Sequence, residues 1–153
     1  MNKKCALLTI EDLSNFKSYD DLLIDPLNLL GWNCVFVPWE FKEVEWDEFD
    51  AVIIRSTWDY QQKYELFFKT LSKIDNSNAK LYNPLNVVEW NLNKRYLKDL
   101  KNKGVDIIPT IFFESYDFQG IKKAFFSFET NKLIIKPSVS ANSDNTYVLE
   151  LSS

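Results

Sequence analysis

Two groups of residues in this sequence could do chemistry, and each follows an apolar run typical of a strand. In the first, Lys136 follows the β-branched run 133–135, and Pro137 then ends strand pairing because it has no backbone N–H. A loop of small polar residues leaves N–H groups free to bind a phosphate beside the lysine. An ordinary surface turn with a solvated lysine is the alternative. The loop residues of interest are Ser138, Ser140, Ala141, Asn142 and Ser143.

The second group follows the apolar run Ile53–Ile54 directly. It combines a guanidinium, two hydroxyls, an indole ring and a carboxylate, in the order Arg55, Ser56, Thr57, Trp58, Asp59. In parallel sheets, ligands collect beyond the carboxyl ends of the strands. The position and the residue types favour a substrate-binding role. The alternative is a loop in which Asp59 only caps the following helix.

A third candidate is Lys94. The pattern of residues 91–100 predicts a helix that Asn91 caps and that closes at Gly104. Lys94 would then lie in the first turn, where a cation opposes the helix dipole. This placement suggests an anion nearby.

The elements that must position these residues follow from the apolar pattern. Continuous apolar runs predict buried strands, and helical spacing at 19–30 and 64–74 separates them. Pro26 either kinks the first helix or starts a shorter one that Asp25 caps. The sequence therefore predicts an α/β fold with a parallel sheet flanked by helices. The predicted strands are Cys5–Ile10, Asn33–Pro38, Ala51–Ile54 and Lys80–Asn83.

The chain after Gly104 has a different pattern and predicts a small α+β lobe. One helix is expected over Phe118–Phe128. The predicted strands are Val105–Ile108, Ile111–Phe113, Lys132–Lys136 and Thr146–Leu151.

Composition narrows the function. The 153 residues carry a formal net charge of −4 with scattered lysines, which disfavours nucleic acid as a partner. No apolar run is long enough to span a membrane and no signal peptide is visible, so a cytoplasmic protein is expected. The absence of histidine excludes Ser-His-Asp catalysis and His-ligated zinc. Cys5 and Cys34 are expected to be buried, small hydrophobic residues.

With these motifs in order, the chain resembles the ATP-grasp superfamily, in its branch that contains glutathione-synthetase-like and D-cycloserine-pathway ligases. Four segments carry the resemblance: Arg55–Tyr60, Asn83-Pro84 with Asn91–Leu97, Gly104 with Ile108-Pro109-Thr110, and Ile135–Thr146.

The resemblance implies a substrate-side pre-ATP-grasp domain at 1–90 and the first lobe of the nucleotide-binding domain at 91–153. Members join a carboxylate to an amine through an acylphosphate, using ATP and Mg²⁺. Lys94 and Lys136 would then contact ATP phosphates, and the loop 138–145 would close over them. Residues 55–59 would line the site of an amino-acid-like substrate.

The sequence departs from the family pattern in two respects. Asn142 lies in a loop that usually carries glycine, although Asn tolerates positive φ. The chain also ends before the second lobe, where the magnesium ligands are expected, so no catalytic residue or metal ligand is assigned here. We therefore expect a truncated N-terminal part that is inactive alone, with a complementing C-terminal chain as a further partner. The alternative is a non-catalytic α/β module that binds a small anion or a partner protein.

Overall fold

The chain divides into two compact units, residues 1–90 and 91–153. The computed structural model describes residues 3–151, and each unit is considered by itself. Within these residues, no helix is long and apolar enough to cross a membrane. The roles assigned to the two units stay predictions.

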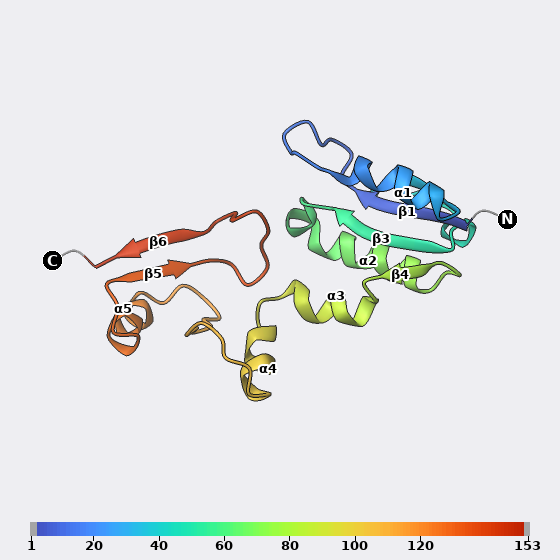
Figure 1. The fold of residues 1–153 in the computed structure, drawn as a ribbon. Coiled ribbons are helices and arrows are strands. Elements are labelled where there is room, and N and C mark those ends of the chain that lie inside the picture. Colours follow the sequence, from blue (N-terminus) through green and yellow to red (C-terminus); the bar gives the residue numbers. More distant parts are fainter. Residues whose placement is uncertain (1–2, 152–153) are drawn as a thin grey trace. The chain divides into compact units, whose positions relative to one another are not determined.

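The first unit is built on a four-stranded parallel sheet in the order β2-β1-β3-β4. Figure 1 labels β1, β3 and β4 of this sheet. All four predicted strands are present, and the α/β class is confirmed. Strand β3 continues two residues beyond the predicted end, so Arg55 and Ser56 belong to the strand rather than to a loop. The strands are β1 (Lys3–Thr9), β2 (Trp32–Pro38), β3 (Ala51–Ser56) and β4 (Lys80–Tyr82).

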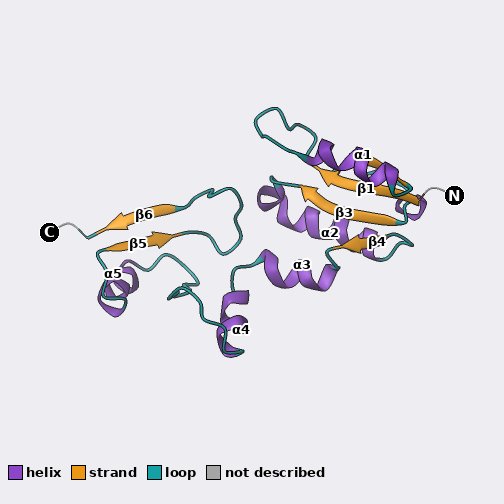
Figure 2. Ribbon diagram, viewed as in Figure 1, coloured by secondary structure: helices purple, strands orange, loops and turns teal. Residues whose placement is uncertain are grey.

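Helices flank this sheet (Figure 2). The connection from β1 to β2 contains the 3₁₀ helix η1 (Asp20–Leu23) and α1 (Ile24–Leu29). The connection from β3 to β4 contains η3 (Tyr60–Lys63) and α2 (Tyr64–Asp75). The two connections run in opposite directions across the sheet, so right-handed crossovers place α1 and α2 on opposite faces. A further 3₁₀ helix, η2, spans Trp46–Glu48.

The core explains why the strands read as continuous apolar runs. Cys5 and Leu7 pack with Ile24 and Leu27 of α1. The alternating residues of β1 point to the opposite face, and α2 buries one apolar face of its own. Both faces of the central strands are thus covered by helices. The buried apolar residues of α2 are Phe67, Leu71 and Ile74.

The two cysteines lie side by side within this core. Cys5 and Cys34 are paired in the register of β1 and β2, and both are free thiols that are buried as predicted. Burial, followed by the neighbouring Cys34 thiol, raises the pKa of Cys5 to about 12. Cys5 therefore stays a protonated, packed thiol at neutral pH.

Of the two alternatives for Pro26, a kinked long helix or a shorter helix, the structure has the shorter helix. Pro26 lies in the first turn of α1, where its missing N–H costs no helical hydrogen bond. The expected cap by Asp25 is wrong, because α1 begins at Ile24 and has no side-chain cap. Gly31 has a φ of 83°, and its carbonyl accepts a hydrogen bond from the Lys3 N–H. This turn connects α1 to β2.

The predicted helix 91–100 is confirmed for residues 96–100, whereas its predicted start at Asn91 is wrong. Helix α3 (Leu85–Leu92) ends before Lys94, and α4 (Tyr96–Asn102) begins after it. The Asn93 carboxamide accepts the Arg95 N–H at 3.0 Å, a local bond that competes with helix formation. The Lys94 N–H donates to the Ser138 carbonyl at 2.7 Å. Lys94 therefore lies in a turn between helices, and the helix-dipole argument for it does not apply.

The rest of the second unit follows the prediction in part. Helix α5 (Phe118–Ser127) is confirmed, with its N-terminus capped by the Asp117 carboxylate. Strands β5 (Lys132–Ile135) and β6 (Tyr147–Glu150) pair antiparallel. The strands predicted at 105–108 and 111–113 are wrong, since this segment is irregular. It pairs with no strand of the described chain, and Pro109 between the two runs offers no N–H.

Candidate functional site

The strand order places a potential ligand site at the end of the first unit's sheet. The strand β2 lies on one side of β1 in the sheet, and β3, which follows β2 in the sequence, lies on the other side of β1. Such a reversal opens a crevice beyond the carboxyl ends of the two central strands. Thr9 at the end of β1 is paired there with Ser56 at the end of β3.

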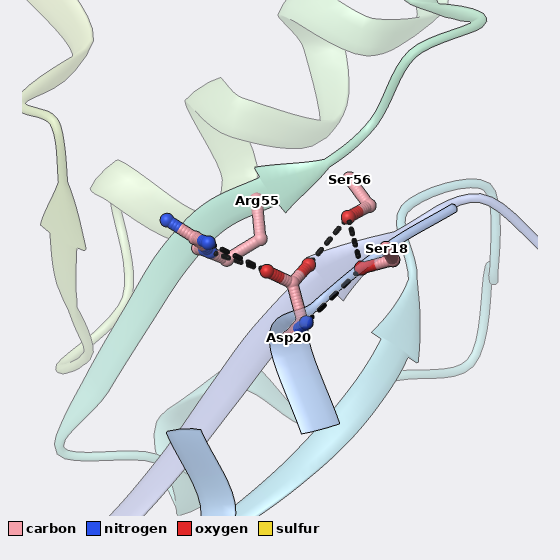
Figure 3. Close-up of polar contacts among 4 residues, drawn as sticks. All are labelled: Ser18, Asp20, Arg55 and Ser56. Carbon is pink, nitrogen blue, oxygen red and sulfur yellow. Dashed lines mark hydrogen bonds and ion pairs between the residues drawn. The ribbon is translucent and has the colours of Figure 1, made fainter. Parts of the chain in front are cut away.

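The Asp20 carboxylate forms hydrogen bonds with two residues at the end of β3, Arg55 and Ser56 (Figure 3). Asp20 is only 4% exposed, and one of its oxygens accepts hydrogen bonds from Arg55 Nε at 2.9 Å and Nη2 at 2.6 Å. Its other oxygen accepts a hydrogen bond from the Ser56 hydroxyl. Ser18 Oγ lies 3.1 Å from Ser56 Oγ and accepts the Asp20 N–H at 3.2 Å. The loop after β1 is thereby bound to the end of β3.

An irregularity in β3 lets two consecutive side chains reach one carboxylate. Leu8 pairs with Ile54, but Thr9 pairs with Ser56, so the register shifts and Arg55 is the extra residue. Regular alternation would send Arg55 and Ser56 to opposite faces. The extra residue removes this constraint, as a β-bulge does.

The ionisation of Asp20 depends on its partners. Burial by itself raises the pKa of this carboxyl group, but the hydrogen bonds from Ser56 and Arg55, the charge of Arg55 and the contact with Ser18 outweigh burial. The net effect is a pKa below the ordinary value. Asp20 is therefore an anion at neutral pH, and its charge is matched by Arg55.

The other predicted substrate residues lie at the same edge, but their contacts differ from the expectation. Asp59 accepts the Trp39 indole N–H at 2.7 Å and makes no side-chain cap to η3, so the capping alternative is wrong. Trp58 packs against Phe16, with ring centroids 5.3 Å apart. Thr57 is buried. Their substrate-binding role stays a prediction.

Sequence reasoning missed Ser18, Phe16 and Asp20, all from the segment after β1. The polar stretch that follows β1 was a visible signal, since it also occupies the carboxyl end of a strand. Its pairing with β3 was not visible, because the residues of the Asp20–Arg55 contact are 35 positions apart.

The second unit brings Lys94 to the loop that follows β5. Its ammonium group donates to the Ser140 carbonyl at 2.9 Å and to the Ser140 hydroxyl at 2.8 Å. With the bond from its N–H to Ser138, Lys94 is attached to this loop through both backbone and side chain.

The charge of Lys136 also acts on Lys94. The pKa of Lys94 is lowered, first by burial and then by the positive charge of Lys136. Along residues 3–151, neither ammonium group forms an ion pair with a carboxylate. Within the described part of the chain, two cations thus lie near one loop without a carboxylate paired to either of them.

The loop itself has an unusual backbone for a segment without glycine. Asn142, Ser143 and Asn145 have φ values of 50°, 63° and 52°. The N–H of Asp144 donates to the Ala141 carbonyl, and the N–H of Thr146 donates to the Ser143 carbonyl. Asn142 thus adopts the left-handed conformation that glycine commonly provides.

Replacing Ser143 tests whether this backbone is needed. Ser143→Val should lower the free energy of unfolding by about 1–2 kcal/mol, because a β-branched residue is strained at positive φ. Ser143→Gly should stay within about 0.5 kcal/mol of the parent, since relief of strain and the greater freedom of the unfolded chain oppose each other. Urea denaturation monitored by circular dichroism measures both. Equal stability of the valine and glycine variants would contradict the left-handed conformation.

Replacing Lys136 tests its proximity to Lys94. Lys136→Met removes the positive charge and should raise the pKa of Lys94, although burial keeps it lowered in part. Titration of ¹³C-labelled lysine side chains by NMR measures this pKa. Lys123→Met on the exposed side of α5 is the matched control and should leave it unchanged. An unchanged Lys94 pKa in Lys136→Met would show that the two groups do not interact.

The described residues do not supply a metal centre. Residues 3–151 contain no group of three or more His, Cys, Asp or Glu side chains that could hold a metal ion.

The fold and these two sites can be compared with known proteins. The family described as the N-terminal domain of the D-cycloserine synthetase DcsG matches residues 5–83. The cycloserine biosynthesis protein DcsG of Streptomyces lavendulae is 33% identical over 88 residues, which cover 58% of this chain and 29% of that protein.

Solved structures show the same relationship over most of the chain. The crystal structure of DcsG matches with a TM-score of 0.85 and 26% identity, over 96% of this chain and 50% of that one. The ATP-grasp ligase PsnB, complexed with a minimal precursor, Mg and ADP, matches with a TM-score of 0.53, 15% identity and coverage of 95% and 57%. The macrocyclase MdnC of Microcystis aeruginosa MRC, bound with the precursor peptide MdnA, matches with a TM-score of 0.58, 14% identity and coverage of 97% and 60%.

These matches establish the family of the chain. The chain spans about half the length of the solved structures that it matches. The likeness to PsnB and MdnC concerns the fold alone. The chain belongs to the family of the DcsG N-terminal domain, within an ATP-grasp-like ligase fold.

Proposed function

We propose that this chain is part of an ATP-dependent ligase that joins a carboxylate to an amine. In this proposal, Lys94, Lys136 and the loop 138–145 bind the phosphates of ATP. Residues 55–59 and Asp20 form the substrate side of the first unit. The ligase family supports the class of reaction, and the residues below support the assignment of the phosphate site.

The observation that carries the phosphate site is the pair of lysines without counter-charges. Lys136 lowers the pKa of Lys94, which is unfavourable for folding unless an anion relieves the repulsion. The polyphosphate of ATP is such an anion. Because Lys94 is bound to Ser140, a phosphate at this position would be recognised by a preformed cation and a loop with positive φ residues.

The chemistry would proceed by two transfers. A substrate carboxylate oxygen attacks the γ-phosphorus of ATP, and ADP leaves, which gives an acylphosphate. The amine then attacks the acyl carbon, and inorganic phosphate leaves. The ammonium groups of Lys94 and Lys136 would stabilise the negative charge on the transferring phosphoryl group.

A titration of the ¹⁵N-labelled chain with ATP, followed by NMR, tests the phosphate site. Saturable shifts are expected at Lys94, Lys136 and residues 138–145, with adenosine as the control that lacks phosphates. Shifts confined to other residues would refute the site. Phosphate binding as strong as that of ATP would favour the alternative, a module that binds a small anion.

A second measurement concerns the reaction. Release of ADP that depends on an added amino-acid mixture would support the ligase. The same assay is made on a longer chain that also contains the segments by which the matched structures exceed this one. If that chain binds ATP but releases no ADP, the result would count against the ligase.

A further inference from the structure

We propose that a pocket at the carboxyl ends of β1 and β2 binds the primary ammonium group of a small organic amine with an apolar body. The inference rests on the proposed ligase function, because this molecule would be its amine substrate. The pocket has a volume of about 490 Å³, and the residues that carry the argument are Thr9, Glu11, Phe16, Asp20, Asp21 and Phe36.

The first observation is the unused hydroxyl of Thr9. Thr9 is 5% exposed, and its Oγ1 is buried without a hydrogen-bond partner along residues 3–151. By strand alternation its side chain lies on the face of Cys5 and Leu7, the face that α1 covers. The pocket that Thr9 lines lies on this face too, beside Asp20. A buried polar group without a partner is costly, and a ligand N–H at the pocket would satisfy it.

The second observation is the charge of the pocket. Asp20, Asp21 and Glu11 line it, and the charge of Asp20 is matched by Arg55. In the described part of the chain, neither Glu11 nor Asp21 forms an ion pair. The remaining charge is negative and calls for a cation.

Neighbouring lysines balance this charge only in part. Lys63 donates to both oxygens of Glu40, at 2.9 and 2.7 Å, and its pKa is raised first by this hydrogen bond and also by the charge of Glu11. The ammonium group of Lys17 lies over the ring of Tyr19, 5.3 Å from its centroid. Among residues 3–151, neither lysine forms an ion pair with Glu11 or Asp21, so these carboxylates are open to a cation from a ligand.

The third observation distinguishes an organic amine from a metal ion. Half of the residues that line the pocket are apolar, among them Phe16 and Phe36, and no three acidic or other ligating groups of the described residues could hold a metal ion together. Aromatic rings attract organic ammonium groups, whereas Mg²⁺ dehydrates reluctantly and prefers oxygen ligands. The packing of Phe16 against Trp58 also connects the pocket to the residues proposed for the substrate.

The test is an NMR titration of the ¹⁵N-labelled 153-residue chain with n-propylamine at neutral pH. Saturable shifts are expected at residues 9–21. Sodium propionate and magnesium chloride, at matched ionic strength, should leave these residues unshifted. Propionate binding as tight as propylamine binding, or no saturable shift with propylamine, would overturn the proposal.

Variants locate the binding groups. Glu11→Gln and Asp21→Asn should each weaken propylamine binding by up to about fivefold, as expected for one partly exposed charge. Thr9→Val should weaken it by about two- to tenfold through the lost hydrogen bond, yet fold normally because this hydroxyl has no hydrogen-bond partner among residues 3–151. Glu43→Gln is the control outside the pocket. Unchanged affinity in all three pocket variants would refute the site.

Separate titrations distinguish a failure of the amine pocket from a failure of the proposed ligase function. ATP is titrated separately and reports on Lys94 and Lys136. Binding of ATP without propylamine would refute the amine pocket alone. Binding of propylamine without ATP would support the pocket and count against the ligase.

Discussion

Replacing Asp20 with asparagine should lower the free energy of unfolding by about 2–3 kcal/mol. The substitution keeps the shape of the side chain but removes the charge that Arg55 and Ser56 bind. Hydrogen bonds to charged groups contribute about 1.5–3 kcal/mol, and breaking a fully buried ion pair costs about 3–5 kcal/mol. The Arg55 side chain is 43% exposed, so water can hydrate its charge in the variant, and the expected loss is smaller than for a fully buried ion pair.

Urea denaturation of the parent and Asp20→Asn measures the difference. Asp21→Asn removes the neighbouring carboxylate, which is exposed, and as the matched control should change the stability by less than about 0.5 kcal/mol. An Asp20→Asn variant as stable as the parent would show that the network adds nothing to the fold.

The same variant should alter the dependence of stability on pH. The folded pKa of Asp20 is lowered, so its contribution is fully present above the unfolded value of about 3.9. As the pH falls through the folded pKa, the native carboxylate is protonated and this contribution is lost. The difference between parent and Asp20→Asn should therefore shrink below about pH 4. A difference that grew on acidification would have the wrong sign for this network.

The second large effect is expected on ATP affinity. Lys94→Ala and Lys136→Ala should each weaken ATP binding by about 1.5–3 kcal/mol, the range for a hydrogen bond to a charged group. The two losses should be non-additive, because the lysines are proposed to share one phosphate site and the pKa of Lys94 is lowered by burial and by the charge of Lys136. Calorimetry of the single and double variants measures the coupling.

Two controls keep this test specific. Lys123→Ala on the exposed face of α5 removes a lysine of the same unit and should leave ATP affinity unchanged. Lys94→Ala also removes the bonds to Ser140, so the fold of each variant is first checked by its NMR spectrum. Unchanged ATP affinity in both folded single variants would sink the phosphate site.

The sequence by itself determined the elements whose signals are local. Apolar runs identified β1 and β3, because strands buried on both faces need apolar residues at nearly every position. The strand β4 (Lys80–Tyr82) was also predicted, although only Leu81 of its three residues is buried. Helical spacing likewise identified α2 and α5. The resemblance to ATP-grasp ligases named the class of protein, and the family match supports it.

Only the tertiary structure decided which side chains meet and where some elements stop. The Asp20–Arg55 contact joins residues 35 positions apart, and Lys94 reaches Ser140 over 46 positions; no local pattern encodes either pairing. The extra residue in β3 turns Arg55 and Ser56 toward one carboxylate, against simple alternation. The loop after β5 takes the N–H of Lys94 and so separates α3 from α4. Residues 105–113 had the composition of strands but no partner in the described chain, and a strand needs a partner for its hydrogen bonds.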